Sequence, residues 1–275
     1  MRSAIWVPLF DALAEPAAVV RLAVEAEEAG WDGFFVWDHV NWRAPVRAVA
    51  DPWIVMAAIV ARTERLRVGP MVTPVARRRP AKLARETATL DQLSGGRLTL
   101  GVGLGSDRFG REYSALGDET DDRVRAELLD ESLEILKAAW TGDPVDHQGK
   151  HFTVDGISFE PRPAQRPGVP IWVAGYTGKT RPMRRAAQYD GFFPVNLEHP
   201  DQVAEVAATI GSLRAPATTT YDIAVGLPPD ADPAPYAEAG ATWRLVAFGP
   251  NDLTVDEVRA VVRAGPGWDQ DDVTE

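Results

Sequence analysis

Short apolar runs alternate along the chain with segments whose apolar residues recur every three or four positions. The run Ile5–Leu9 is followed by residues 16–29, where the apolar spacing i, i+3, i+4, i+7 is typical of an amphipathic helix. Pro16 opens this segment and Gly30 follows it, as expected at the two ends of a helix. The same alternation predicts eight strands: Ile5–Leu9, Gly33–Trp37, Leu66–Val72, Arg97–Val102, Ile171–Ala174, Gly191–Val195, Tyr221–Val225 and Trp243–Phe248.

A predicted helix follows each of these strands. Strict strand–helix alternation indicates an α/β protein with a parallel sheet covered by helices. Eight units within 275 residues favour a closed (β/α)8 TIM barrel over an open doubly wound sheet, with residues 1–275 as a single domain. The periodicity is lost over about 142–168, which predicts an insertion between strands four and five with a hairpin around 152–159. Residues 265–275 form an acidic tail.

Composition narrows the classes of function. With 29 basic against 40 acidic residues the formal charge is −11, which disfavours nucleic-acid and anionic-membrane binding. The absence of cysteine excludes disulfides, thiolate nucleophiles and Cys-type metal sites, and the four histidines have no metal-ligand spacing, so no metal is expected. No apolar run is long enough to span a bilayer, and no leader pattern opens the chain, so a soluble cytoplasmic protein is expected. A homodimer is left open.

In a barrel of this kind, function lies in the loops after the strands. The loop Gly175–Arg181 after the fifth strand combines two glycines, two threonines and two cations before a predicted helix at Pro182. This is a pattern that suits a phosphate. Arg77, Arg78 and Arg79 similarly precede a helix at Pro80, where the helix dipole disfavours cations unless an anion is present. The alternative is that these are solvated surface arginines.

His39 is the only histidine that directly follows a predicted core strand, and it stands beside Asp38. We expect it to contact a ligand, although a lone histidine at a strand end is often only a packed, hydrogen-bonded residue. Trp6, Trp37 and Trp42 would supply an apolar wall. The Gly101–Gly105 run lacks the helix and the spaced acidic residue of a dinucleotide fingerprint; it is either a tight turn or room for a flat ring.

Several of these stretches resemble the luciferase-like flavin/deazaflavin (F420)-dependent oxidoreductases, a (β/α)8 family. The resemblance is carried by Trp37-Asp38-His39, Pro70-Met71-Val72-Thr73-Pro74, Leu90-Asp91-Gln92-Leu93-Ser94-Gly95-Gly96-Arg97 and Pro170-Ile171-Trp172-Val173-Ala174-Gly175. It is good from Ile5 to about Phe193 and thin beyond.

The resemblance implies a cofactor, F420 or FMN, across the carboxyl ends of the strands. His39 would be the catalytic residue facing its ring. Other cofactor contacts would come from the strand-three residues, often over a non-proline cis peptide, from the glycines after strand four and from the strand-five loop: Pro70, Met71, Val72, Gly103, Gly105, Ala174, Gly175, Tyr176, Thr177 and Gly178. Ser106 stands where the family's sugar-phosphate dehydrogenases carry a catalytic glutamate, which argues against that activity.

F420 is favoured because Arg77 and Arg78 would meet its acidic polyglutamyl tail. The expected activity is hydride transfer between F420 and a small organic substrate. A monooxygenase using reduced FMN and O2 remains the alternative. A reading from another class is a non-redox barrel that binds a phosphorylated ligand.

Overall fold

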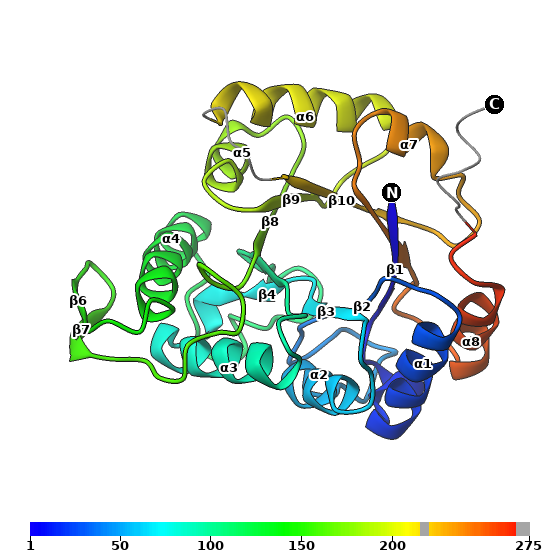
Figure 1. The fold of residues 1–275 in the computed structure, drawn as a ribbon, viewed down its shortest axis with the longest axis horizontal. Helices are drawn as coiled ribbons and strands as arrows, with labels where there is room; N and C mark the ends of the chain where they lie inside the picture. The colour runs from blue at the N-terminus through cyan, green and yellow to red at the C-terminus, as the bar shows by residue number, and fades with distance from the viewer. Residues whose placement is uncertain (215–219, 268–275) are drawn as a thin grey trace.

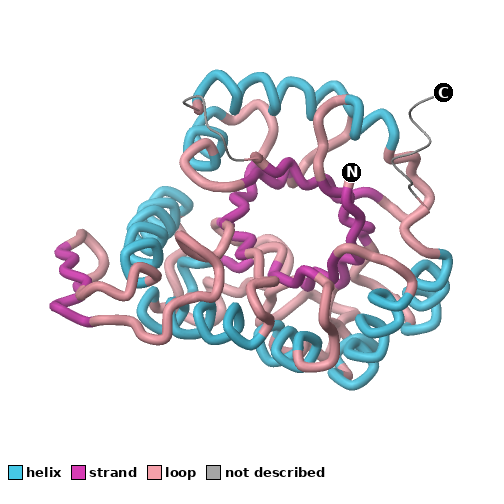
Figure 2. Tube along the Cα trace, viewed as in Figure 1, coloured by secondary structure: helices cyan, strands magenta, loops and turns pink. Residues whose placement is uncertain are grey.

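In the computed structural model, which describes residues 1–214 and 220–267, parallel strands form a ring with helices outside it (Figure 2). The sheet runs in the order β3-β2-β1-β11-β10-β9-β8-β5-β4. Its end strands are β3, which lies within the predicted third strand, and β4, which follows three residues later just beyond the predicted end, so the sheet closes on itself. The strands span Arg2–Val7 (β1), Gly33–Val36 (β2), Arg67–Pro70 (β3), Thr73–Pro74 (β4), Leu100–Gly103 (β5), Ile171–Gly175 (β8), Gly191–Pro194 (β9), Asp222–Leu227 (β10) and Trp243–Ala247 (β11). The predicted TIM barrel is confirmed.

Helices cover the outside of the ring (Figure 1). They span Pro16–Glu28 (α1), Pro52–Val60 (α2), Pro80–Leu93 (α3), Asp122–Ala139 (α4), Thr180–Ala186 (α5), Pro200–Leu213 (α6), Ala234–Glu238 (α7) and Val255–Ala264 (α8). The buried face predicted for α1 is confirmed: Val19, Leu22, Ala23 and Ala26 are all fully buried. Side-chain caps begin α2 and α4, since Asp51 accepts from the N–H of Ile54 and Asp121 from that of Val124.

Large side chains fill the interior of the barrel. Phe35, Trp172 and Trp243 stack or pack edge-on against one another, and Met71 belongs to the same cluster. The barrel is therefore a packed core, and only the carboxyl ends of its strands are available for a site.

The structure departs from the predicted elements mainly at the third and fourth strands. The peptide bond Met71–Val72 is cis and separates β3 from β4, at the place where the family resemblance puts a non-proline cis peptide. The fourth strand begins at Leu100 rather than Arg97, because Leu98 makes only an isolated bridge to Val68.

The predicted insertion carries the hairpin β6–β7, with β6 at Val145–Gln148 and β7 at Thr153–Ile157. It lies at the periphery beyond α4 (Figure 1) and so does not contribute to the mouth of the barrel. Residues 268–275 of the acidic tail lie outside the described part of the chain. No helix in residues 1–214 and 220–267 has the length and apolar character needed to cross a bilayer.

Candidate active site

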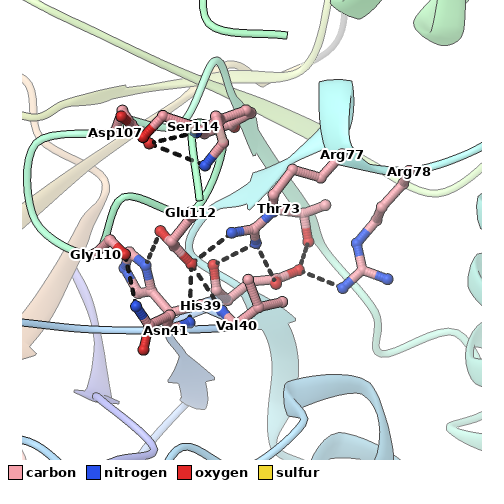
Figure 3. A network of polar contacts seen from close by, with 12 residues as sticks. His39, Val40, Asn41, Thr73, Arg77, Arg78, Asp107, Gly110, Glu112 and Ser114 are labelled. Carbon is pink, nitrogen blue, oxygen red and sulfur yellow. Dashed lines mark hydrogen bonds and ion pairs between the residues drawn. The ribbon is translucent and has the colours of Figure 1, made fainter. Parts of the chain in front are cut away.

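A buried network of charged side chains joins the carboxyl ends of β2, β4 and β5 (Figure 3). Asp38, which follows β2, is fully buried and accepts hydrogen bonds from Thr73 Oγ1 at 2.8 Å and from Trp53 Nε1 at 3.2 Å. Arg77 and Arg78 each donate to the same carboxylate, at 3.1 and 2.8 Å. A buried carboxylate requires this kind of compensation, since an unpaired charge in an apolar interior is very costly.

Glu112 is the second carboxylate of the network and is the residue that contacts His39. Its side chain is 2% exposed; Oε2 lies 2.8 Å from His39 Nδ1, while Oε1 accepts from the backbone N–H of Val40 at 2.7 Å and from Arg77. Burial by itself would raise the pKa of Glu112. The hydrogen bond and charge of His39, the charge of Arg77 and the Val40 N–H outweigh burial and lower this pKa below its usual value.

An ionised Glu112 determines which nitrogen of the neutral His39 ring carries the proton. The carboxylate accepts the Nδ1 proton of a neutral His39, which leaves the lone pair on Nε2. The His39 side chain is 21% exposed, and Nε2 has no partner among the described residues. The arrangement can therefore take a proton at Nε2, with Glu112 stabilising the imidazolium that results.

The loop between β5 and α4 brings Glu112 to this position. Asn41 Nδ2 donates to the Gly110 carbonyl at 2.6 Å, and Asp107 accepts from the backbone N–H groups of Tyr113 and Ser114. The Tyr113 hydroxyl donates to the Leu104 carbonyl at 2.7 Å. The part of the loop from Leu104 to Ser114 is thus held by its own hydrogen bonds and tied to the segment that carries His39.

We expect Gly110→Ala to lower activity while leaving most of the stability intact. A β-carbon at position 110 would stand 2.3 Å from the Asn41 carbonyl oxygen, so the loop must move away and carry Glu112 from His39. A loss of about 1 Å of positioning can cost about 100-fold in rate. Steady-state kinetics and a thermal melt should be compared with those of Gly249→Ala, since a β-carbon added at Gly249, on the same face of the barrel, would meet nothing within 4 Å. Equal activity of the two variants would contradict the prediction.

The anions that offset Arg77 and Arg78 at the start of α3 belong to the protein itself. Arg77 is 5% exposed and bridges Asp38 and Glu112, while Arg78 pairs with Asp38. The cations at this helix start therefore do not require a ligand anion, and their presence there does not by itself indicate the acidic tail of F420. That Arg77 and Arg78 bind the cofactor stays a prediction without this support. Arg79 is exposed and lies over the ring of Phe152.

Aromatic rings surround His39. Its ring centroid lies 4.6 Å from that of Trp42 and 5.8 Å from those of Phe10 and Trp37. Trp42 stacks on Phe109 with centroids 5.0 Å apart and planes 11° from parallel. We call Phe10, Trp37, Trp42 and Phe109 the aromatic cluster. Trp6, expected as part of the same wall, packs 5.4 Å from Trp37 and donates to the Met71 carbonyl.

Three of the predicted ring contacts come together at the ends of adjacent strands. A β-carbon added to Gly103 would meet Val72 Cγ2 at 3.0 Å and Ala174 Cβ at 3.6 Å, so β5 presents bare backbone between these two half-buried side chains. Pro70 and Met71 are buried, and the Met71 side chain belongs to the barrel interior. Within the strand-three stretch, only Val72 remains available to a ligand.

Two predicted glycines serve packing. A β-carbon at Gly105 would stand 2.1 Å from the Tyr113 hydroxyl, and one at Gly175 would stand 2.3 Å from Pro182 Cβ. Each glycine thus makes room for the protein's own side chain. A larger residue at position 175, as in Gly175→Val, would therefore disturb the contact between β8 and α5.

The remaining residues of the strand-five loop differ in their availability. Thr177 is held by Asn196, whose Oδ1 accepts its N–H at 2.8 Å and whose Nδ2 donates to its Oγ1. Gly178 has φ +71° and open space where a side chain would be, and its N–H has no partner among the described residues. Tyr176 is exposed. Gly178 therefore offers the close backbone approach that a phosphate needs.

Glu112 is the functional candidate that sequence reasoning missed. Ser106, the residue expected to mark a departure from the family, has a hydroxyl that accepts the Arg108 N–H and makes no contact with His39. Nothing in Gly110-Arg111-Glu112-Tyr113 marks a site. The only indication was indirect. Two arginines precede α3, and Asp38 is the one nearby carboxylate that the sequence suggests as a partner, so a second carboxylate had to come from elsewhere in the chain.

Comparison with known proteins identifies the family. Residues 3–238 match the luciferase-like monooxygenase family, so the chain belongs to it. The F420-dependent glucose-6-phosphate dehydrogenase of Nocardia farcinica is 38% identical over 60% of this chain. That of Rhodococcus erythropolis is 29% identical over 93% of this chain. The aligned part spans 50% of the Nocardia protein and 89% of the Rhodococcus protein.

Solved structures confirm the barrel. Monooxygenase RslO1 from Streptomyces bottropensis superposes with a TM-score of 0.74 at 21% identity, over 96% of this chain and 97% of that one. An F420-dependent secondary alcohol dehydrogenase in complex with an F420-acetone adduct superposes with a TM-score of 0.69 at 22% identity, over 95% and 81% of the two chains. At these identities the likeness concerns the fold.

Proposed function

We propose that the chain is an oxidoreductase that transfers hydride between F420 and a small organic substrate. The observation that carries the proposal is the contact between His39 Nδ1 and buried Glu112, which leaves Nε2 of the partly exposed ring without a partner among the described residues. The F420-dependent relatives from Nocardia and Rhodococcus support F420 as the cofactor.

In this proposal His39 moves the proton that accompanies the hydride. Oxidation of an alcohol removes a hydride from carbon and a proton from oxygen. His39 Nε2 accepts that proton, and Glu112 holds the ring and stabilises the imidazolium. In the reverse direction the imidazolium returns the proton to the carbonyl oxygen. F420, when bound, supplies the hydride acceptor or donor.

The strand ends fit a flat cofactor with a phosphate. The half-buried side chains of Val72 and Ala174 would lie under its ring, and Gly103 between them leaves the room that the Val72 side chain occupies. Gly178, with its open side and free N–H, would hold the phosphate, and the Thr177 hydroxyl lies beside it.

Titration of the purified chain with oxidised F420 and with FMN tests the proposal. We expect F420 to bind more tightly, and reduced F420 to be consumed with a carbonyl substrate without uptake of O2. Tight binding of FMN, no binding of F420 and consumption of O2 would overturn it in favour of an FMN monooxygenase. Binding of neither cofactor would favour a barrel without redox chemistry.

We expect the double substitution of Lys179 and Arg181 by Gln to weaken F420 binding about tenfold. Lys179 adjoins Gly178 and Arg181 lies in the first turn of α5, and neither has an ion-pair partner in the part of the chain that the structure describes. They are the cations nearest in sequence to the proposed phosphate position, whereas Arg77 and Arg78 are already paired. Added salt should weaken F420 binding to the unaltered chain and have less effect on the variant. Calorimetric titration at two salt concentrations measures both effects, with Arg79→Gln as the control. If the double variant keeps the salt dependence of the unaltered chain, Lys179 and Arg181 do not bind the negative charge of the cofactor.

A further inference from the structure

We propose that the substrate is an uncharged alcohol or carbonyl compound with an apolar, ring-sized body, and that a phosphorylated sugar is excluded. The inference rests on the proposed function and adds the chemical class of its substrate. Three observations carry it: the aromatic cluster around His39, two indole N–H groups without partners, and the distribution of charge around the mouth of the barrel.

The aromatic cluster gives the proton-transfer residue an apolar setting. Phe10, Trp37 and Trp42 all approach the His39 ring within 6 Å between centroids. A substrate whose oxygen reaches Nε2 must place its body against these rings. Flat apolar groups gain from stacked or edge-on contact with such rings, whereas the many hydroxyl groups of a sugar would be desolvated against a wall that offers few hydrogen-bond partners.

Two polar atoms of the cluster lack partners. The indole N–H groups of Trp37 and Trp42 are buried and have no hydrogen-bond partner among the described residues, and Trp42 as a whole is 8% exposed. A buried donor left unsatisfied is unfavourable, and a ligand oxygen can satisfy it. These two donors are neutral, so they suit a carbonyl, hydroxyl or ether oxygen, and they lie beside the group proposed to carry the proton.

Half of the mouth is acidic. The segments after β1, β9, β10 and β11 (residues 8–15, 195–199, 228–233 and 248–254) contain no lysine or arginine. They carry six acidic residues: Asp11, Glu15, Glu198, Asp230, Asp232 and Asp252. These four segments would present like charge to a phosphate dianion and no lysine or arginine of their own; the cation paired with Glu15 is Arg21 of α1, at 3.6 Å. On the opposite side, Arg77 and Arg78 are neutralised by Asp38 and Glu112.

The cations nearest the cluster lie on its rim. Arg43 and Arg108 each place the guanidinium 5.4 Å from the centroid of Phe109, and both are exposed. In water such groups bind an anion weakly. The polar groups that select the substrate are therefore the buried indole N–H groups of Trp37 and Trp42 rather than these arginines.

The test compares acetophenone and 1-phenylethanol with glucose 6-phosphate. Binding to the full chain is measured by calorimetry, with and without saturating oxidised F420, and turnover is followed through the cofactor absorbance. We expect acetophenone to bind and glucose 6-phosphate to show no heat of binding. Trp42→Phe, which keeps a ring and removes the N–H, should weaken acetophenone binding about fivefold, as for one lost hydrogen bond. Trp37→Phe provides the same test if Trp42→Phe does not fold, and the double variant Arg43→Gln/Arg108→Gln should bind acetophenone normally.

The outcomes separate this inference from the proposed function. Tighter binding of glucose 6-phosphate than of acetophenone, abolished in the Arg43/Arg108 variant, would overturn the substrate class and leave hydride transfer standing. Unchanged acetophenone affinity in both tryptophan variants would overturn the role of the indole donors. Acetophenone binding without any change in F420 absorbance, in either direction of reaction, would leave the substrate class standing and count against hydride transfer.

Discussion

His39→Asn should lower kcat by about 100- to 10,000-fold, the range that general acid–base residues contribute. Asparagine keeps a donor near the position of Nδ1, so it can still bond to Glu112, but it offers nothing that accepts a proton in place of Nε2. The buried network around Glu112 and Arg77 should therefore remain intact. Cofactor affinity and the melting temperature should stay close to those of the unaltered chain.

His147→Asn provides a matched control for this variant. His147 also contacts a carboxylate, Glu131, but it lies on the peripheral hairpin β6–β7. This substitution should leave kcat unchanged. If His39→Asn melts far below the unaltered chain yet retains normal activity per folded molecule, His39 is a structural residue and the proposed mechanism fails.

The fold could be predicted in detail because it depends on local pattern. The spacing of Val19, Leu22 and Ala26 determines which face of α1 is buried, and this requires no knowledge of distant residues. The interruption between β3 and β4 has no such signal: Leu66–Val72 reads as one apolar strand, and the break at Met71–Val72 was expected only from the family resemblance.

The site was predicted less well, because it depends on partners that are distant in the sequence. His39 and Asp38 could be singled out, since they directly follow a strand. Glu112 is 73 residues from His39 and reaches it only through the folding of the loop after β5. For the same reason the ion pairs of Arg77 could not be foreseen, because its carboxylate partners Asp38 and Glu112 are distant in the sequence. The packing roles of Gly105 and Gly175 were likewise hidden, because their neighbours Tyr113 and Pro182 are brought to them by tertiary packing.

Arg77→Met should destabilise the chain by about 3–5 kcal/mol, the cost of removing one partner from a buried ion pair. Arg77 is 5% exposed and is the only side chain that bonds to both Asp38 and Glu112 among the described residues. Methionine fills similar volume, so the loss comes from two buried carboxylates that keep fewer donors. Chemical denaturation at pH 7 measures the change, and Arg79→Met, at the exposed neighbouring position, should cost far less.

The sign of the pH dependence gives this prediction a second test. In the unaltered chain the pKa of Glu112 is lowered, so Glu112 contributes stability above its unfolded pKa near 4.5, and this contribution is lost as the pH falls through the folded value. Arg77 is one of the groups that lower this pKa, while the hydrogen bond and charge of His39 remain without it, so Glu112 has a higher pKa in the variant than in the unaltered chain. The difference in unfolding free energy between the two proteins should therefore narrow as the pH is lowered from 7 through the folded pKa of Glu112 in the variant. A difference that is constant over this range would mean that Arg77 acts through packing alone, and that the charge balance of the buried network is not what holds Glu112 beside His39.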